Sequence, residues 1–318
     1  RSLGLEAGGA VGIPFYLAQT LSIAFYIIGF SELWINMFPS HSIRLTGFIV
    51  WLLLSILSVV STRLALRVQF FVLGAIGLSI ISFLLGPSHN SNGPILLGSF
   101  EQAGFWATFA IFFPAATGIL AGASMSGDLK DPRKSIIWGT LAAIITGLVV
   151  YLIVAYWFAK QAPADLLLAN SSIILDLSLF KPLIIAGILG ATLSSALSTM
   201  VGAPRILAAL AENRTIPLAR VLASKTPNNE PRNAILVSSA IALVVIMVGN
   251  LDSLATMLTM FFLATYGAIN LIVFIEKTLG IASFRPQFDL ALVIPIVGFC
   301  GCLGAMLLIN KLFTILAI

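Results

Sequence analysis

The chain has 318 residues, of which 59% are hydrophobic and 9% are charged, and its mean hydropathy is +1.07. A soluble domain of this length usually carries about a quarter charged residues. The 17 basic and 12 acidic side chains are therefore too few to cover a globule with a solvated surface. This composition argues against a soluble enzyme, a nucleic-acid-binding protein and a disordered chain, and it indicates an all-α polytopic membrane protein.

A helix needs roughly 17–25 predominantly apolar residues to cross a bilayer. Nine stretches meet or nearly meet that length, and short polar segments rich in turn-forming residues separate them. We expect all nine to be transmembrane helices. In chain order they are Ala10–Phe38, Leu45–Ser61, Val68–Leu85, Phe105–Ser126, Ile136–Ala159, Leu183–Met200, Ala234–Gly249, Leu254–Ile275 and Leu290–Ile309.

The basic residues give these spans an orientation. If the chain starts in the cytoplasm, nine spans leave only four of the 17 basic residues outside, namely Arg44, Lys160, Lys181 and Lys311. This positive-inside bias predicts a cytoplasmic N-terminus for the chain. The excess of basic residues behind the net charge of +5 then lies in the cytoplasmic loops, and it requires no nucleic-acid partner. In one such loop, Asp128 and Asp131 are expected to serve in turns and helix caps.

The fourth span is interrupted. Pro114 has no N–H, and its ring would clash with the carbonyl of Ala110, so the helix is predicted to open there. Carbonyls freed by such a break can coordinate a cation, and N–H groups at the start of the second half-helix can hold an anion. The alternative is a simple proline kink followed by a Gly-x-x-x-Gly packing seam at Gly118 and Gly122.

Further polar residues lie within the other spans. In the sixth span, Ala191, Ser194 and Ser195 share one helical face, which either offers oxygen ligands to a small cation or joins two helices. Tyr26 and Tyr266 lie inside their spans, away from the membrane interfaces where tyrosine usually gathers. A phenol buried there needs a hydrogen-bond partner, either in the protein or in a ligand. Glu32 is the acidic residue furthest inside a span, and it either acts in function or extends to the outer surface.

Several of these motifs resemble one known family. Residues 110–122 read AIFFPAATGILAG and are similar to the sixth-helix signature of the cation-chloride cotransporters, a branch of the amino acid-polyamine-organocation superfamily. Residues 191–197 (ATLSSAL) resemble that family's eighth helix, and residues 261–266 (FFLATY) resemble its tenth. The likeness runs in order over nearly the whole chain.

The resemblance implies ligands for three ions. The potassium site corresponds to Tyr26, Pro114 and Thr117, the chloride site to Gly118, Ile119, Leu120 and Tyr266, and the sodium site to Ala191, Ser194 and Ser195. Family members that do not transport sodium lack the serine pair that corresponds to Ser194 and Ser195. Members that carry only sodium and chloride lack the tyrosine of family helix three that corresponds to Tyr26. Both features occur here, so the best match is the sodium-potassium-chloride type. Glu32 resembles an outer-gate carboxylate.

The resemblance also implies a fold. Its members have two inverted repeats of five helices (a LeuT-type, five-plus-five fold), with helices one and six broken around a central site. The nine spans would be family helices three to eleven. Residues 1–318 are therefore expected to form a single transmembrane transporter domain that lacks helices one and two, most of helix twelve and the cytosolic C-terminal domain.

The expected function is secondary active symport of sodium, with potassium, and chloride, by alternating access around the broken helix. No enzyme activity and no cofactor are expected beyond the transported Na⁺, K⁺ and Cl⁻. The expected location is the plasma membrane, and the expected partners are the lipid bilayer, small ions and a second copy of the chain. Two alternatives stay open: an amino acid or amine permease of the same superfamily, and a non-transporting membrane subunit.

Overall fold

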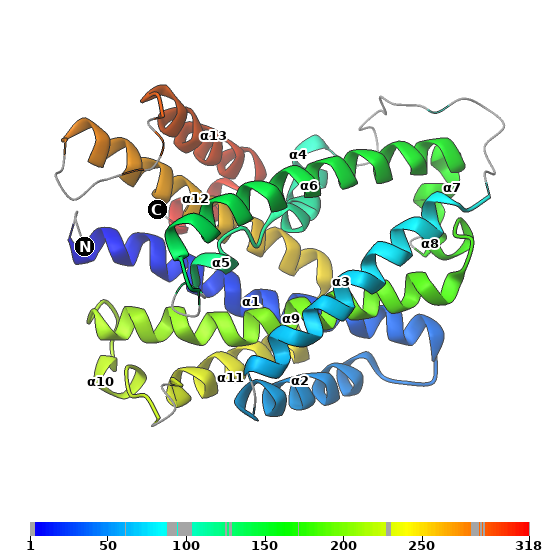
Figure 1. Cartoon of the computed structure of the whole chain (residues 1–318), viewed down its shortest axis with the longest axis horizontal. Helices are drawn as coiled ribbons and strands as arrows, with labels where there is room; N and C mark the ends of the chain where they lie inside the picture. Colours follow the sequence, from blue (N-terminus) through cyan, green and yellow to red (C-terminus); the bar gives the residue numbers. More distant parts are fainter. Residues whose placement is uncertain are drawn as a thin grey trace. The chain divides into compact units, whose positions relative to one another are not determined.

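The structure, a computed structural model, describes residues 4–60, 62–87, 94, 104–124, 126, 129–170, 172–226, 230–280, 286, 288 and 290–317. Every regular element in these ranges is a helix (Figure 1). The elements are α1 (Leu5–Met37), α2 (Ile43–Val60), α3 (Thr62–Leu84), α4 (Phe105–Phe112), η1 (Phe113–Ala116), α5 (Ala121–Ser124), α6 (Pro132–Gln161), α7 (Ala164–Ala169), α8 (Ile173–Asp176), α9 (Lys181–Glu212), α10 (Ala219–Leu222), α11 (Arg232–Val248), α12 (Leu251–Thr278), α13 (Val293–Ile309) and α14 (Lys311–Ala317).

Each of the nine apolar stretches contains helix among the described residues, which confirms the all-α prediction. Four helices among the described residues, α1, α6, α9 and α12, are long and apolar enough to cross a membrane, and the other stretches form shorter apolar helices. The bounds differ most in α9, which continues to Glu212 beyond the predicted end at Met200. Pro204 lies inside this helix, where it removes one hydrogen-bond donor without ending the helix.

The chain divides into two compact units. The first consists of Arg1–Phe25, Ala103–Thr117 and Thr199–Ile318, and the second of Tyr26–Gln102 and Gly118–Ser198. Two long helices, α1 and α9, each contribute part of their length to both units. One boundary between the units falls between Thr117 and Gly118, within the fourth apolar stretch.

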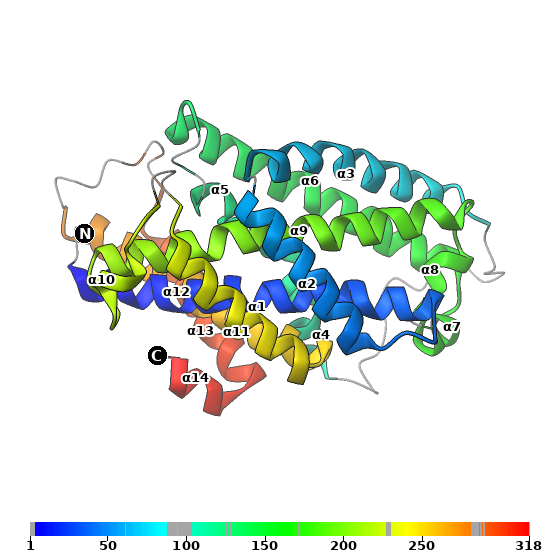
Figure 2. The ribbon, with the colours of Figure 1, turned by 90° about the horizontal axis from the view of Figure 1, so that it is seen from below.

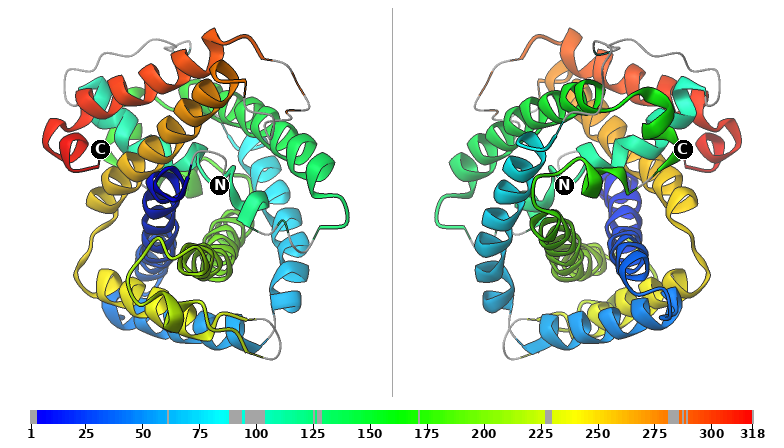
Figure 3. Two further views of the ribbon diagram at one scale, coloured as in Figure 1. Left: turned by 90° about the vertical axis from the view of Figure 1, so that its left-hand side faces the viewer. Right: turned by 90° about the vertical axis from the view of Figure 1, so that its right-hand side faces the viewer.

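In the first unit, α12 packs along α13 and also contacts α4, η1 and α14 (Figures 1 and 3). The helix begins at Asn250, whose side chain accepts a hydrogen bond from the Ser253 N–H at 2.9 Å and caps the first turn. Its core face buries Met260 and Leu263 against residues of α13, with aromatic side chains of α4 and η1 packed around them. This packing fixes α4 and η1 on α12.

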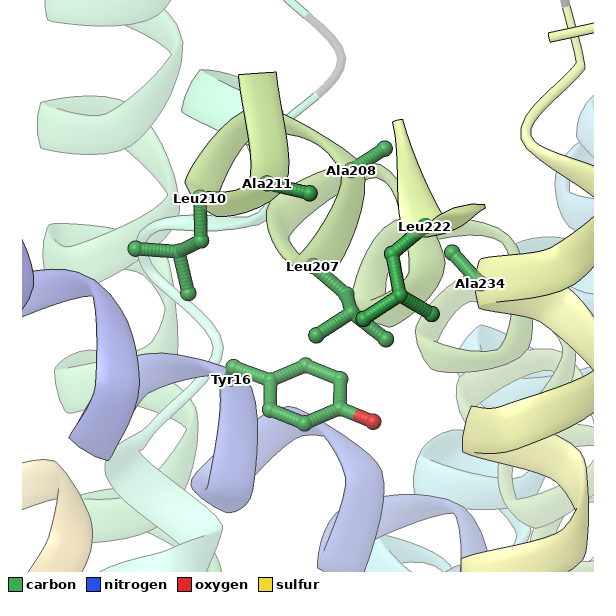
Figure 4. Packing of buried hydrophobic residues seen from close by; sticks show 7 residues of the cluster. All are labelled: Tyr16, Leu207, Ala208, Leu210, Ala211, Leu222 and Ala234. Carbon is green, nitrogen blue, oxygen red and sulfur yellow. The ribbon is translucent and has the colours of Figure 1, made fainter. Parts of the chain in front are cut away.

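A second core of the first unit joins α1, α9, α10 and α11 (Figure 4). The Tyr16 hydroxyl lies 3.2 Å from the Ser238 hydroxyl of α11. Gly12 lets α1 and α9 approach closely, because a Cβ there would lie 2.5 Å from Leu210 Cδ2. The buried members shown in Figure 4 are Tyr16, Leu207, Ala208, Leu210, Ala211, Leu222 and Ala234.

In the second unit, α3 contacts α2 and α6 (Figure 2). The Ser82 hydroxyl near the end of α3 accepts a hydrogen bond from the Phe180 N–H at 2.9 Å and lies 3.2 Å from the Phe180 carbonyl. At Gly86 the chain passes so close to the α8 segment that a Cβ would lie 1.7 Å from the Leu177 carbonyl oxygen. The core of this region consists of Phe83, Ala162, Ile173, Leu177 and Ile184.

Helix α6 is apolar around its whole circumference, and none of its most apolar 18-residue window is buried within the chain. Polar contacts lie at its two ends. Asp131 caps the first turn by accepting from the Lys134 N–H at 3.4 Å, as predicted, whereas Asp128 lies outside the described residues. At the other end, the buried Gln161 amide donates to the carbonyls of Phe83 at 3.2 Å and Gly86 at 3.0 Å.

Candidate functional site

The fourth apolar stretch is broken, as the sequence predicts. Helix α4 ends at Phe112, and a single 3₁₀ turn, η1, follows from Phe113 to Ala116 with Pro114 near its start. Thr117 is then extended, with φ −91° and ψ −175°, and Gly118 has a φ of +90°. A positive φ is readily adopted only by glycine, so this residue allows the chain to leave one helical segment and begin the next.

The role that the structure gives to Gly118 is its positive φ, and the alternative of a Gly-x-x-x-Gly seam stays a prediction. Such a seam requires neighbouring atoms close to both glycines. Among the described residues, no neighbouring atom lies within 4 Å of a Cβ built at Gly118 or at Gly122.

Two of the three predicted potassium ligands lie together. The Pro114 carbonyl accepts from the Thr117 N–H at 3.1 Å, and the Thr117 Oγ1 lies 2.6 Å from the same carbonyl oxygen. A carbonyl oxygen and a hydroxyl oxygen are therefore adjacent at the end of η1. Tyr26 is half-buried in α1 and belongs to the second unit, so its place in this set stays a prediction.

The predicted chloride ligands also belong to both units. Gly118 begins the second segment of the second unit, and its carbonyl accepts from the Ala121 N–H at 3.0 Å, where α5 begins. This bond uses none of the N–H groups of residues 118–120 that are predicted to hold the anion. Tyr266 lies in the first unit, where its ring stands 6.4 Å from the Phe113 ring of η1 and stacks on Phe262 at 5.8 Å.

The predicted sodium ligands lie on the uninterrupted part of α9 in the second unit. Ala191, Ser194 and Ser195 are all partly buried there. The Ser194 carbonyl accepts from the Ser198 hydroxyl at 2.9 Å, and Ser198 in turn accepts a hydrogen bond from the Gln69 amide of α3. The next serine along this helix therefore joins two helices, and the sodium assignment of the face itself stays a prediction.

The predicted gate residue, Glu32, is half-buried in the last two turns of α1. The end of this helix is held by side chains that the sequence analysis does not single out. The Trp34 indole donates to the His41 ring at 3.0 Å, and the Asn36 amide donates to the Ser172 hydroxyl at 3.2 Å.

One further residue beside the break was missed. The Thr259 hydroxyl of α12 donates to the Ala110 carbonyl of α4 at 2.6 Å. A signal for it is present in the sequence, because Pro114 deprives this carbonyl of its helical donor. The identity of the new donor depends on which helix packs there, and apolar periodicity does not supply that information.

Comparison with known proteins places these observations in a family. A sequence model of the family described as "Amino acid permease" matches residues 1–318. The chain is 32% identical over 374 residues to Solute carrier family 12 member 2 of Mus musculus, covering 98% of this chain and 31% of that protein. It is 31% identical over 375 residues to Solute carrier family 12 member 1 of Homo sapiens (98% and 34%).

A plant protein is similarly related. Cation-chloride cotransporter 1 of Arabidopsis thaliana is 30% identical over 375 residues, which cover all of this chain and 38% of that protein. The chain thus spans about a third of the length of the curated relatives it matches.

Proposed function

Because the chain belongs to the amino acid permease family, we propose that it forms the ion-binding part of a secondary active symporter that couples sodium, together with potassium, to chloride. The observation that carries the proposal is the break at Thr117 and Gly118, which follows two adjacent oxygen atoms. The similarity to cation-chloride cotransporters supports ion symport. This is a family of transporters, and the proposed activity requires no covalent chemistry.

Each ion is assigned to groups whose chemistry suits it. Potassium would bind the Tyr26 phenol with the Pro114 and Thr117 oxygens, and sodium would bind the carbonyl of Ala191 with the hydroxyls of Ser194 and Ser195. Chloride would bind N–H groups at the start of a half-helix and a phenol. Cation and anion charges cancel, so no carboxylate is required at mid-membrane. The proposed chloride ligands are Gly118, Ile119, Leu120 and Tyr266.

The proposed mechanism is alternating access around the broken helix, within a five-plus-five inverted-repeat fold to which this chain supplies nine membrane spans in a single transporter domain. Glu32 would serve as an outer gate. The expected setting is the plasma membrane with the chain's N-terminus in the cytoplasm, and a homodimer is the expected assembly. Sodium, potassium and chloride are the transported species, and the proposal includes no cofactor and no nucleic-acid partner.

The direct test is uptake by vesicles that contain the full-length protein. Rubidium, as a potassium substitute, and sodium should both enter faster when chloride is present outside. Replacement of chloride by gluconate should reduce both rates to those of protein-free vesicles. Cation uptake that is the same in gluconate as in chloride would refute the proposal.

Two variants test the ligand assignment against each other. Loss of one ligand oxygen is worth about 1.5 kcal/mol, so Tyr26→Phe should raise the rubidium concentration for half-maximal uptake about tenfold. The same variant should leave the sodium value nearly unchanged. Ser194→Ala with Ser195→Ala should show the reverse pattern. Equal effects of both variants on both cations would contradict the assignment.

An amino acid or amine permease is the second candidate, because the family description itself names amino acids. A substrate carboxylate would then occupy the start of the half-helix where chloride is proposed. Uptake of a labelled amino acid that does not depend on chloride would favour this candidate, and the same vesicles serve for that measurement.

A further inference from the structure

The break in the fourth apolar stretch leaves a specific backbone group without its usual partner. In a continuous helix the carbonyl of Ala110 would accept a hydrogen bond from the N–H of residue 114, and proline has none. Ala110 is only 2% exposed, so water has almost no access to it. A buried carbonyl that loses its donor is costly, and the structure must supply another donor.

Thr259 supplies that donor from α12. Its side chain is 0% exposed, and its hydroxyl lies 2.6 Å from the Ala110 carbonyl oxygen, 149 positions away in the sequence. This bond is unusual among the threonines of the helix. Thr265 and Thr278 donate at 2.8 Å and 2.7 Å to carbonyls four positions earlier in α12 itself. The Thr259 hydroxyl instead connects α12 to the end of α4.

The same face of α12 carries residues that contact η1. Thr259, Phe262 and Tyr266 follow one another at intervals of three and four, so they lie along one side of the helix. Tyr266 lies beside Phe113, which in turn lies 5.3 Å from Phe109 of α4. One end of this face therefore holds the last turn of α4, and its other end carries a proposed chloride ligand.

We infer that Thr259 is a positioning residue for the ion site: its hydroxyl replaces the donor that Pro114 lacks and so fixes the register of α4 and η1 on α12. The inference rests on the proposed function, because it names how the proposed ligands are held. Without the hydroxyl, the end of α4 must shift to find another donor for Ala110. Such a shift moves the Pro114 and Thr117 oxygens relative to Tyr266.

The test uses Thr259→Val, which keeps the shape of the side chain and removes the hydroxyl. In vesicles with the full-length protein, this variant should raise the chloride concentration for half-maximal rubidium uptake about tenfold, the effect expected if the shifted site loses one hydrogen bond to the ion. Thr259→Ser keeps the hydroxyl and should stay within about twofold of the wild type. Thr265→Val is the matched control, because the Phe261 carbonyl keeps its backbone donor, and it should also stay within about twofold.

A second background tests the link to the proline. Pro114→Ala restores an N–H opposite Ala110, so Thr259→Val should have no further effect on the half-maximal concentration once this change is present. The inference is overturned if Thr259→Val behaves like Thr265→Val, or if its effect is as large in the Pro114→Ala background as in the wild type.

Thermal unfolding of the purified full-length protein separates this inference from the proposed function. Thr259→Val should lower the unfolding midpoint, and Pro114→Ala should remove that loss, whether or not chloride-dependent uptake occurs. If Thr259→Val alone is not produced, the double variant should restore its yield, and a failure to restore it overturns the inference. A wild type without chloride-dependent uptake that still shows this coupling would refute the function only.

Discussion

The contact between Gly298 of α13 and Asn270 of α12 provides a sharp test of how closely these two helices pack. A Cβ built at Gly298 would lie 2.6 Å from the Asn270 Oδ1 and 2.8 Å from its Cγ. The Asn270 side chain is short, and its amide donates to the Tyr266 carbonyl at 2.8 Å. Gly298→Ala must therefore displace Asn270 and break this bond.

The magnitude follows from three contributions. Overpacking of this kind costs about 1–3 kcal/mol, and the lost hydrogen bond adds about 0.5–1.5 kcal/mol. The better helix propensity of alanine returns about 1 kcal/mol. We therefore expect Gly298→Ala to lower the free energy of unfolding by about 0.5–3.5 kcal/mol. Gly301→Ala in the same helix should raise it by up to about 1 kcal/mol, because no atom of the described neighbouring residues lies within 4 Å of a Cβ there.

Unfolding by sodium dodecyl sulfate in mixed micelles, followed by circular dichroism, gives these free energies. A double-mutant cycle with Asn270→Ala, which removes the obstructing side chain, tests whether this contact causes the loss of stability. In that background Gly298→Ala should no longer destabilise the protein. The reasoning is wrong if Gly298→Ala and Gly301→Ala have equal stability, or if the penalty persists after Asn270 has been removed.

Two further predictions concern the second unit. Gly86→Ala should destabilise the protein by about 3 kcal/mol or more, because its Cβ would lie 1.7 Å from the Leu177 carbonyl oxygen and backbone cannot move aside cheaply. In the part of the chain that the structure describes, no neighbouring atom lies within 4 Å of a Cβ at Gly77, so Gly77→Ala should not destabilise the protein in the same micelle titration. A similar loss of stability in both variants would contradict the explanation. Asp131→Ala should cost about 0.5–2 kcal/mol by removing the cap of α6, and Asp131→Asn should recover most of it. An unchanged unfolding curve for Asp131→Ala would show that the cap does not stabilise the helix.

The helical segments and the break were predictable because both depend on local chemistry. Apolar stretches of membrane length predict helices from composition alone, and Pro114 removes a donor wherever it stands. Asp131 beside Pro132 is a local capping pattern in the same sense. The extra length of α9 was not predictable in this way, since Pro204 is normally a boundary signal and the structure contains it within the helix.

The partners across helices could not be predicted. The Thr259 hydroxyl bonds a carbonyl 149 positions away, and the Gln69 amide bonds Ser198, 129 positions away. Periodicity shows which face of a helix is buried, and it does not show which helix covers that face. The roles of Tyr26, Ser194 and Ser195 have a different status, because they come from resemblance and stay predictions for uptake measurements.

The uniform surface of α6 has a consequence for how this helix can move. Because apolar residues are spread around the whole helix, lipid alone does not favour one rotation of α6 about its own axis over another. Its rotation must then be set by contacts with the rest of the second unit: the Phe158 ring packs 4.6 Å from the Phe83 ring of α3, and the Gln161 amide makes its two hydrogen bonds to Phe83 and Gly86. Substitutions at Phe158 or Gln161 should therefore change the rotation of α6 more than a substitution at Leu148, which is 57% exposed.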